Sequence, residues 1–397
     1  MRTSRLAVLV ALGAVLPALV GSPAWAGGAR SRTAPVPGQQ QGELKGSDTV
    51  AQDGFGVSVA ISGATVVAGA PGYAKSAGRA YVFAKTGAAW KQAAELKGSD
   101  TVAGDYFGYC VVISGTTIVA GSPGYAKDSG RVYVFTATAG GWQQAAELKG
   151  SDTAAGDYFG YSVAISGTTI GVGAPGHAKT AGRVYLFRKT GDSWKQSAEL
   201  KGSDTAADDA FGYAVAISGT TAVVGAPVYT KNTGRAYVFT DTTTGWKQAA
   251  ELKGSDTVGE DGFGVSVAIS GTTAVVGADG HAKGAGRAYV FTNSVGGWKQ
   301  SAELKGADTV ANDGFGISVV LSGTTLIIGA PDHAKLAGRA YVFTGTVGTW
   351  KQAGELKGAD TVANDGFGVS VALSGTTAVV SAPDRASDAG RAYVFNA

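Results

Sequence analysis

Apolar and polar positions alternate in short runs that are typical of β-strands, as the second copy of a repeated pattern illustrates. Residues Phe107–Ser114 alternate with a period of two, and a Ser-Gly turn leads into a second run at Thr116–Ala120. A Gly- and Pro-containing loop at Ser122–Gly130 precedes a third strand, Val132–Thr136. After another Gly-containing turn, Trp142–Leu148 is the fourth. The pattern therefore predicts a four-stranded antiparallel unit.

This unit recurs with a constant step, since Phe107 stands 52 residues after Phe55. A Phe-Gly pair opens every copy, at Phe55, Phe107, Phe159, Phe211, Phe263, Phe315 and Phe367. Four short strands recurring at such a period are typical of a β-propeller, in which each copy forms one blade. We therefore predict an all-β protein, a seven-bladed β-propeller of four-stranded antiparallel blades.

The two ends of the repeated region complement each other. The seventh copy stops after its third strand, at Phe395, and has no fourth. Residues 39–45 precede the first complete copy and carry the Glu-Leu-Lys sequence that ends the fourth strand elsewhere. We expect this N-terminal strand to complete the seventh blade and so remove an exposed sheet edge. A solenoid, the alternative, would need polar caps at both ends. The predicted propeller spans residues 39–397.

The N-terminal residues have the pattern of an export signal. Residues 1–26 combine a basic start, an apolar run at Leu6–Val20 and a small-x-small cleavage site that ends at Ala26. Residues 27–38 contain two prolines and are predicted to be a flexible leader. We therefore expect a secreted, extracellular protein that does not insert into a membrane after the signal is cleaved.

Charge and cysteine content exclude some partners and cross-links. The 33 basic and 30 acidic residues leave a formal charge of +3, which indicates neither a nucleic-acid nor a lipid-surface partner. Cys110 is the only cysteine, so no intramolecular disulfide can form, and we interpret it as a small packing residue. We expect a monomer.

Three motifs recur in the copies: Phe-Gly-x-Ser-Val-Ala-x-Ser, then Gly-Ala-Pro, then Gly-Arg-x-Tyr-x-Phe. Together they resemble the FG-GAP repeat family over residues 43–397, and in particular its bacterial secreted branch. The same repeat builds the propeller head of integrin α subunits, so the resemblance implies a propeller and extracellular recognition or adhesion. The integrin version often carries an Asp-rich calcium loop between the first two strands. Here that turn reads Ser62–Thr65 without a carboxylate, so we expect no calcium there.

The sequence contains few features that indicate catalysis or cofactor binding. No Gly-x-Ser-x-Gly elbow is present, and the three histidines lack a distinctive acid or nucleophile partner. Single histidines on separate blades should not converge on a metal. The recurring aspartates, such as Asp48 and Asp53, are interpreted as partners of turn amides or arginines rather than as a cation ring. We expect no catalytic residue, metal or cofactor, and the alternative is an exported hydrolase or lyase that uses the acidic groups.

Positions that differ between copies point to a binding surface, because the scaffold does not require them. The second to fourth copies gain aromatic residues at the connection and at the start of the first strand, and aromatic and basic residues follow in the loop between the second and third strands. The predicted ligand-binding residues are Tyr106, Tyr109, Tyr125, Lys127, Tyr158, Tyr161, His177, Lys179, Tyr213, Tyr229 and Lys231.

This combination suits a protein or polysaccharide ligand bound at the long-loop end of the ring. A lectin is the sharper alternative and would need aromatic and polar pockets between blades. Tyr109, Tyr161 and Tyr213 also share the apolar register of the first strand, so burial between blades is the competing interpretation.

Overall fold

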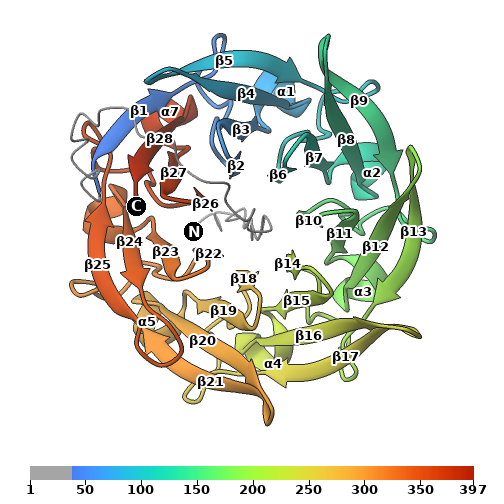
Figure 1. Ribbon diagram of the computed structural model, residues 1–397, viewed down its shortest axis with the longest axis vertical. Helices are drawn as coiled ribbons and strands as arrows, with labels where there is room; N and C mark the ends of the chain where they lie inside the picture. The colour runs from blue at the N-terminus through green and yellow to red at the C-terminus, as the bar shows by residue number, and fades with distance from the viewer. Residues whose placement is uncertain (1–37) are drawn as a thin grey trace, which may run out of the picture.

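Seven four-stranded antiparallel sheets form a closed ring in the computed structural model, which describes residues 38–397 (Figure 1). Within each sheet the first strand lies towards the centre and the fourth at the rim (Figure 1). The predicted all-β, seven-bladed propeller is confirmed. The predicted signal peptide, residues 1–26, and residues 27–37 of the predicted leader lie outside the described residues.

The same four elements recur in every blade. The innermost strands are β2 (Val59–Ser62), β6 (Val111–Ser114), β10 (Ser162–Ser166), β14 (Ala214–Ser218), β18 (Val267–Ser270), β22 (Ser318–Ser322) and β26 (Val371–Ser374). The second strands are β3 (Thr65–Ala70), β7 (Thr117–Ser122), β11 (Thr169–Ala174), β15 (Thr221–Ala226), β19 (Thr273–Ala278), β23 (Thr325–Ala330) and β27 (Thr377–Ala382). The third strands are β4 (Arg79–Thr86), β8 (Arg131–Thr138), β12 (Arg183–Thr190), β16 (Arg235–Thr242), β20 (Arg287–Ser294), β24 (Arg339–Thr344) and β28 (Arg391–Asn396). The fourth strands are β5 (Ala89–Leu96), β9 (Gly141–Leu148), β13 (Ser193–Leu200), β17 (Gly245–Leu252), β21 (Gly297–Leu304), β25 (Lys351–Leu356) and β1 (Gln40–Leu44).

The N-terminal strand completes the seventh blade, as predicted. β1 pairs antiparallel with β28, with Gln40 opposite Phe395 and Leu44 opposite Ala392. The sheet order is β1-β28-β27-β26, so the blade contains one strand from the start of the chain and three from its end. This pairing occupies the edge that β28 would otherwise expose.

The core of each blade lies in its three inner strands. In the first blade, β3 is buried from Val66 to Ala70, and β4 is buried from Ala80 to Phe83. The outer strand β5 instead alternates between exposed and half-buried residues until Leu96, which is buried. Its half-buried face includes Trp90, which packs against the core. The third-strand tyrosines, Tyr81 and its equivalents, are fully buried.

The Phe-Gly pair that opens each copy links neighbouring blades, and this corrects one predicted boundary. Phe107 bridges in parallel to Gly78 of the preceding blade, and its ring packs against Tyr133 of its own blade. Gly108 has φ +82°, and a Cβ there would lie 2.5 Å from the carbonyl oxygen of Arg79. The predicted strand at Phe107–Ser114 is therefore wrong over its first half. Regular pairing begins only at Val111, because the preceding residues join two blades.

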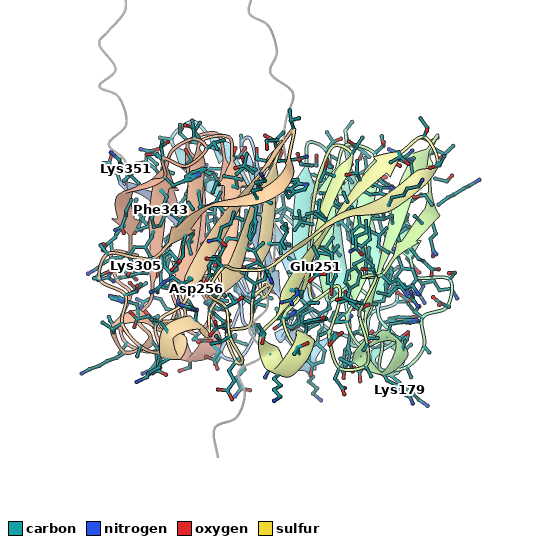
Figure 2. All side chains as sticks on the ribbon, turned by 90° about the horizontal axis from the view of Figure 1, so that it is seen from below. Lys179, Glu251, Asp256, Lys305, Phe343 and Lys351 are labelled. Atoms are coloured by element: carbon teal, nitrogen blue, oxygen red, sulfur yellow. The ribbon has the colours of Figure 1, made fainter. Side chains whose placement is uncertain are left out.

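A short turn of helical type follows the second strand of every blade. These turns are α1 (Tyr73–Ser76), α2 (Tyr125–Asp128), α3 (His177–Thr180), α4 (Tyr229–Asn232), α5 (His281–Gly284), α6 (His333–Leu336) and α7 (Arg385–Asp388). They gather at one end of the ring, where Lys179 projects outwards (Figure 2). We call this end, with the blade-to-blade connections, the long-loop face. No helix in the described part of the chain is long and apolar enough to cross a membrane.

The helical turns also join adjacent blades through their backbone. Ala74, Lys75 and Ser76 all have positive φ, which directs their carbonyl groups towards the next blade. The amide of Gly104 donates to the Lys75 carbonyl at 3.2 Å, and the amide of Tyr106 donates to that of Ser76 at 2.7 Å. The loop conformation is therefore set by the contact between blades, while the side chains at its tip are left to vary.

Candidate functional site

A cavity of about 360 Å³ opens on the long-loop face between the second and third blades. Its walls come from the blade-to-blade connections, the starts of the first strands and the turn α2. The lining residues are Tyr106, Tyr109, Pro123, Gly124, Asp128, Tyr158 and Tyr161. Four of the eleven predicted ligand-binding residues are thus brought together in one place: Tyr106, Tyr109, Tyr158 and Tyr161.

Two of these tyrosines stand where the backbone favours glycine. Tyr106 and Tyr158 both have φ +56° and are 42% and 41% exposed. The equivalent residues of the other blades are Gly54, Ala210, Gly262, Gly314 and Gly366. A left-handed conformation costs a non-glycine residue about 1–2 kcal/mol. The backbone conformation of Tyr106 and Tyr158 therefore costs free energy. Their exposed rings gain too little from burial to offset this cost.

The deeper wall is part of a row of three tyrosine rings that are tilted relative to one another. The rings of Tyr109 and Tyr161 lie 5.1 Å apart between centroids, and those of Tyr161 and Tyr213 lie 4.9 Å apart. Tyr161 is only 6% exposed, and burial raises the pKa of both Tyr109 and Tyr161, so both hydroxyls are protonated at neutral pH. Both hydroxyl oxygens are buried, and the Tyr161 hydroxyl interacts with its neighbours Tyr109 and Tyr213. The two residues therefore contribute mainly ring surface to the cavity.

Tyr213 is the third member of this row and does not line the cavity. It is half-buried and packs against Val265 and Ile317. The competing interpretation, in which the first-strand tyrosines are buried between blades, therefore describes Tyr213 and the rings of its two neighbours. Tyr109 and Tyr161 also line the cavity.

The predicted loop tyrosines are held within their own blades. The hydroxyl of Tyr125 donates to Asp100 at 2.7 Å, and the guanidinium of Arg131 lies 4.4 Å from the Tyr125 ring centroid. Tyr229 makes the same contact with Asp204, at 2.8 Å. Neither tyrosine lines the cavity. Both tyrosines were predicted to bind a ligand because they vary between copies. Their hydroxyls instead donate hydrogen bonds to the aspartate of the connection that precedes the blade.

His177 has a similar structural role. Its Nδ1 lies 2.9 Å from Oδ2 of Asp157, and its Nε2 lies 3.7 Å from Oδ2 of Asp152. The predicted lysines Lys127, Lys179 and Lys231 are exposed on the long-loop face, and none of them lines the cavity. The three lysines lie on the same face as the cavity but do not form its walls.

Sequence reasoning missed Asp128, Gly124 and Pro123 as cavity residues. Asp128 adds a carboxylate to an otherwise aromatic wall. A Cβ at Gly124 would lie 2.1 Å from the carbonyl oxygen of Gly104 and 2.7 Å from Cδ2 of Tyr106, so this glycine allows the connection to approach closely. The variation of the Asp128 position between copies could have identified it, since its equivalents are Ser76, Thr180, Asn232, Gly284, Leu336 and Asp388.

The recurring aspartates stabilise the connections, largely as interpreted from the sequence. Asp53 accepts a hydrogen bond from the amide of Val50 at 2.7 Å, as an aspartate that closes a turn does. Asp48 accepts instead from the hydroxyls of Tyr73 and Tyr81, both at 2.7 Å, which the sequence did not indicate. Burial raises the pKa of Asp48, but these hydrogen bonds outweigh it and lower the pKa overall.

One partly buried carboxyl breaks the repeat between β19 and α5. Asp279 occupies a position that is proline in the other six blades: Pro71, Pro123, Pro175, Pro227, Pro331 and Pro383. Burial raises its pKa to about 6, and the nearby Asp332 carboxylate acts in the same direction. Gly262 beside it leaves room, since a Cβ there would lie 3.1 Å from Oδ1 of Asp279.

Comparison with known proteins gives a matching repeat family and two similar proteins. Seven segments match the family model described as FG-GAP repeat, at residues 39–83, 90–135, 142–187, 194–239, 246–291, 298–343 and 350–395. The chain is 32% identical to human (Homo sapiens) integrin alpha-D over 146 residues, which cover 32% of this chain and 12% of that protein. The crystal structure of Sqt1 from Saccharomyces cerevisiae superimposes with a TM-score of 0.48 at 13% identity, covering 88% of this chain and 97% of that chain.

Proposed function

The chain belongs to the FG-GAP repeat family, and from this premise we propose that it is a secreted binding protein that recognises an extracellular polysaccharide or protein through its long-loop face. The observation that carries the proposal is the pair Tyr106 and Tyr158. Their rings are exposed in backbone conformations that glycine adopts in four other blades, so the fold does not require them. The cavity between them is the binding site of this proposal.

The chemistry of the cavity favours a polysaccharide over a protein ligand. A volume of about 360 Å³ accommodates a small unit such as a sugar ring and lies in the usual range for small-molecule pockets. Tyrosine faces can pack against the C–H face of a sugar, while the carboxylate of Asp128 can bind its hydroxyl groups. An aromatic and polar pocket between two blades is also what the lectin alternative required.

Two further features support the extracellular setting and the class of partner. Residues 1–26 have the composition of a cleavable export signal. The formal charge of +3 over 397 residues provides no broad electrostatic surface for nucleic acid. In this proposal the protein is a monomer that binds its ligand and does not catalyse a reaction.

The test is a binding screen of the mature protein, residues 27–397, on glycan arrays and on arrays of extracellular proteins. We expect binding to a defined set of glycans. Binding only to proteins would support the family function but reject the polysaccharide. A panel of glycoside hydrolase and lyase substrates, run beside the arrays, tests the enzymatic alternative, and turnover of any substrate would favour it.

A further inference from the structure

The fifth blade brings a histidine and two carboxylates together on one side of the ring. Asp256 comes from the connection that precedes the blade, His281 from α5 and Glu303 from β21. Each offers one ligand atom, and these three atoms lie within 4.8 Å of one another. Figure 2 labels Asp256 towards the long-loop end of the ring. We propose that Asp256, His281 and Glu303 bind a divalent transition-metal ion of the zinc class.

The orientation of the imidazole supports this assignment. Nδ1 of His281 lies 2.9 Å from Oδ2 of Asp261, whose side chain is only 5% exposed. A proton on Nδ1 donates to this carboxylate, and the lone pair of the neutral ring is then on Nε2. Metal-binding histidines are usually held in this way by a second carboxylate that fixes the tautomer. Asp261 is therefore a positioning residue, and Nε2 is the ligand atom.

The His281 imidazole lies between two carboxylates, those of Asp261 and Asp256. In that tautomer, Nε2 is a hydrogen-bond acceptor, yet it lies 3.6 Å from Oδ2 of Asp256, which is another acceptor. In the seventh blade, Arg385 occupies the position equivalent to His281. There Arg385 donates to Asp360 at 2.6 Å and to Asp365 at 2.9 Å, so a positive charge lies between the same two carboxylates.

The third ligand, Glu303, has a different partner from its equivalents in the two other blades that contain histidine. In the third blade, Oε1 of Glu199 accepts hydrogen bonds from Ser151 and Gln196. In the sixth blade, Oε1 of Glu355 accepts a hydrogen bond from Gln352. Oε1 of Glu303 accepts instead from Nε of Arg287, at 2.8 Å, and its Oε2 is without a hydrogen bond in the described region. Within residues 38–397, this is the only set of three such ligands with the required spacing.

The donor set indicates which metals fit. One imidazole nitrogen and two carboxylate oxygens are ligands of Zn²⁺. Ligand bonds of about 2.1 Å in a tetrahedron place ligand atoms about 3.4 Å apart, so the three side chains must move together slightly. The side chains of Asp256 and Glu303 are 47% and 34% exposed and have room to rotate. The fourth position is left to water.

This inference revises the expectation, drawn from the sequence, that no metal binds. We expected no metal because histidines from different blades would have to converge on the same ion. The structure instead surrounds one histidine with carboxylates that pack against the same blade. The site is separate from the tyrosine cavity, so its failure would leave the proposed polysaccharide site untouched.

Zinc titration of metal-free, untagged protein by isothermal calorimetry tests the site, with cobalt absorption spectroscopy as a second readout. We expect one zinc ion per chain and a cobalt spectrum typical of four-coordinate nitrogen and oxygen ligands. His281→Tyr and Glu303→Gln should each weaken zinc binding by at least about tenfold, and Asp261→Asn by about 10–100-fold. Calcium should not compete, because imidazole is not a preferred calcium ligand.

Matched variants make the result specific to the fifth blade. Tyrosine occupies the His281 position in the first, second and fourth blades, so His281→Tyr should preserve the fold. His177→Tyr and His333→Tyr change equivalent histidines and should leave zinc binding unchanged. Absence of zinc binding by the parent protein would overturn the proposal. So would full binding by His281→Tyr, or equal losses in all three histidine variants.

Discussion

Arg391 in the last strand donates a hydrogen bond from Nε to Oε1 of Glu43 in the first described strand, at 2.8 Å. The same contact joins the third and fourth strands within a single copy, for example between Arg287 and Glu303 at 2.8 Å. The N-terminal strand therefore reproduces the contacts of an internal fourth strand. The ring is closed by an ordinary blade assembled from the two ends of the chain.

Deletion of residues 39–45 should destabilise the seventh blade. The deletion exposes the edge of β28 and removes Leu44, which is 1% exposed. Loss of a buried leucine alone costs about 2–5 kcal/mol, so we expect the free energy of unfolding to fall by at least about 2 kcal/mol. We also expect association through the free edge. Urea denaturation and size-exclusion chromatography measure the two effects.

Glu43→Gln is the control for this deletion, because it removes only a solvent-exposed ion pair and should cost less than about 1 kcal/mol. If the deletion variant has the same urea midpoint as the parent and remains monodisperse, β1 does not close the ring.

Replacing Tyr106 and Tyr158 together by glycine should separate binding from stability. Glycine relieves the left-handed strain, and its greater freedom in the unfolded chain offsets part of that gain. We therefore expect the free energy of unfolding to stay within about 1 kcal/mol of the parent. Affinity for a glycan identified on the array should fall at least tenfold, as measured by calorimetry.

Tyr73→Phe is the matched control for the double glycine variant. It removes a tyrosine hydroxyl on the same face, outside the cavity, where it binds Asp48. We expect this variant to bind the glycan normally. Undiminished binding by the double glycine variant would exclude the cavity, whereas a large loss of stability would assign the two rings to packing.

Asp279 should make the protein less stable as the pH rises from 4 to 6. Its pKa is raised from 3.8 to about 6, so in this range the folded state binds more protons than the unfolded state. Stability falls with pH under that condition and is level again above the folded pKa. Asp279→Asn should remove this slope and increase the free energy of unfolding at pH 7 by about 1–3 kcal/mol.

Urea denaturation at several pH values compares the Asp279→Asn variant with the parent. The two proteins should agree near pH 4, where the carboxyl is protonated in the folded state. A difference at pH 4 as large as that at pH 7 would show that Asn acts through packing and not through the charge.

Cys110 should be unreactive until the protein unfolds. The thiol is fully buried, burial raises its pKa to about 12, and its sulfur accepts a hydrogen bond from the amide of Val163 at 3.2 Å. Ser58 makes the equivalent contact with Val111 at 2.8 Å, so Cys110→Ser should change the free energy of unfolding by less than about 1.5 kcal/mol. Rapid labelling of the native protein by a thiol reagent would contradict this account.

The repeated parts of the fold could be predicted from the sequence alone. Alternation of apolar residues is a local property, and seven copies in one register make the blade, the number of blades and the closing strand recognisable. The Tyr106 and Tyr158 positions were also recognisable, because both depart from the glycine of other copies. In each case the information lies within one copy or in a comparison of copies.

Only the tertiary structure decided which side chains meet. Tyr125 and Tyr106 both appear as variable aromatic residues, yet one hydroxyl is bound to Asp100 and the other ring lines a cavity. Likewise, Nδ1 of His281 contacts Asp261, which directs Nε2 towards Asp256. These contacts join connections, turns and strands that are far apart in the sequence. Alternation and spacing do not encode them, because they depend on how the blades pack and on which of several polar partners lies within hydrogen-bonding distance.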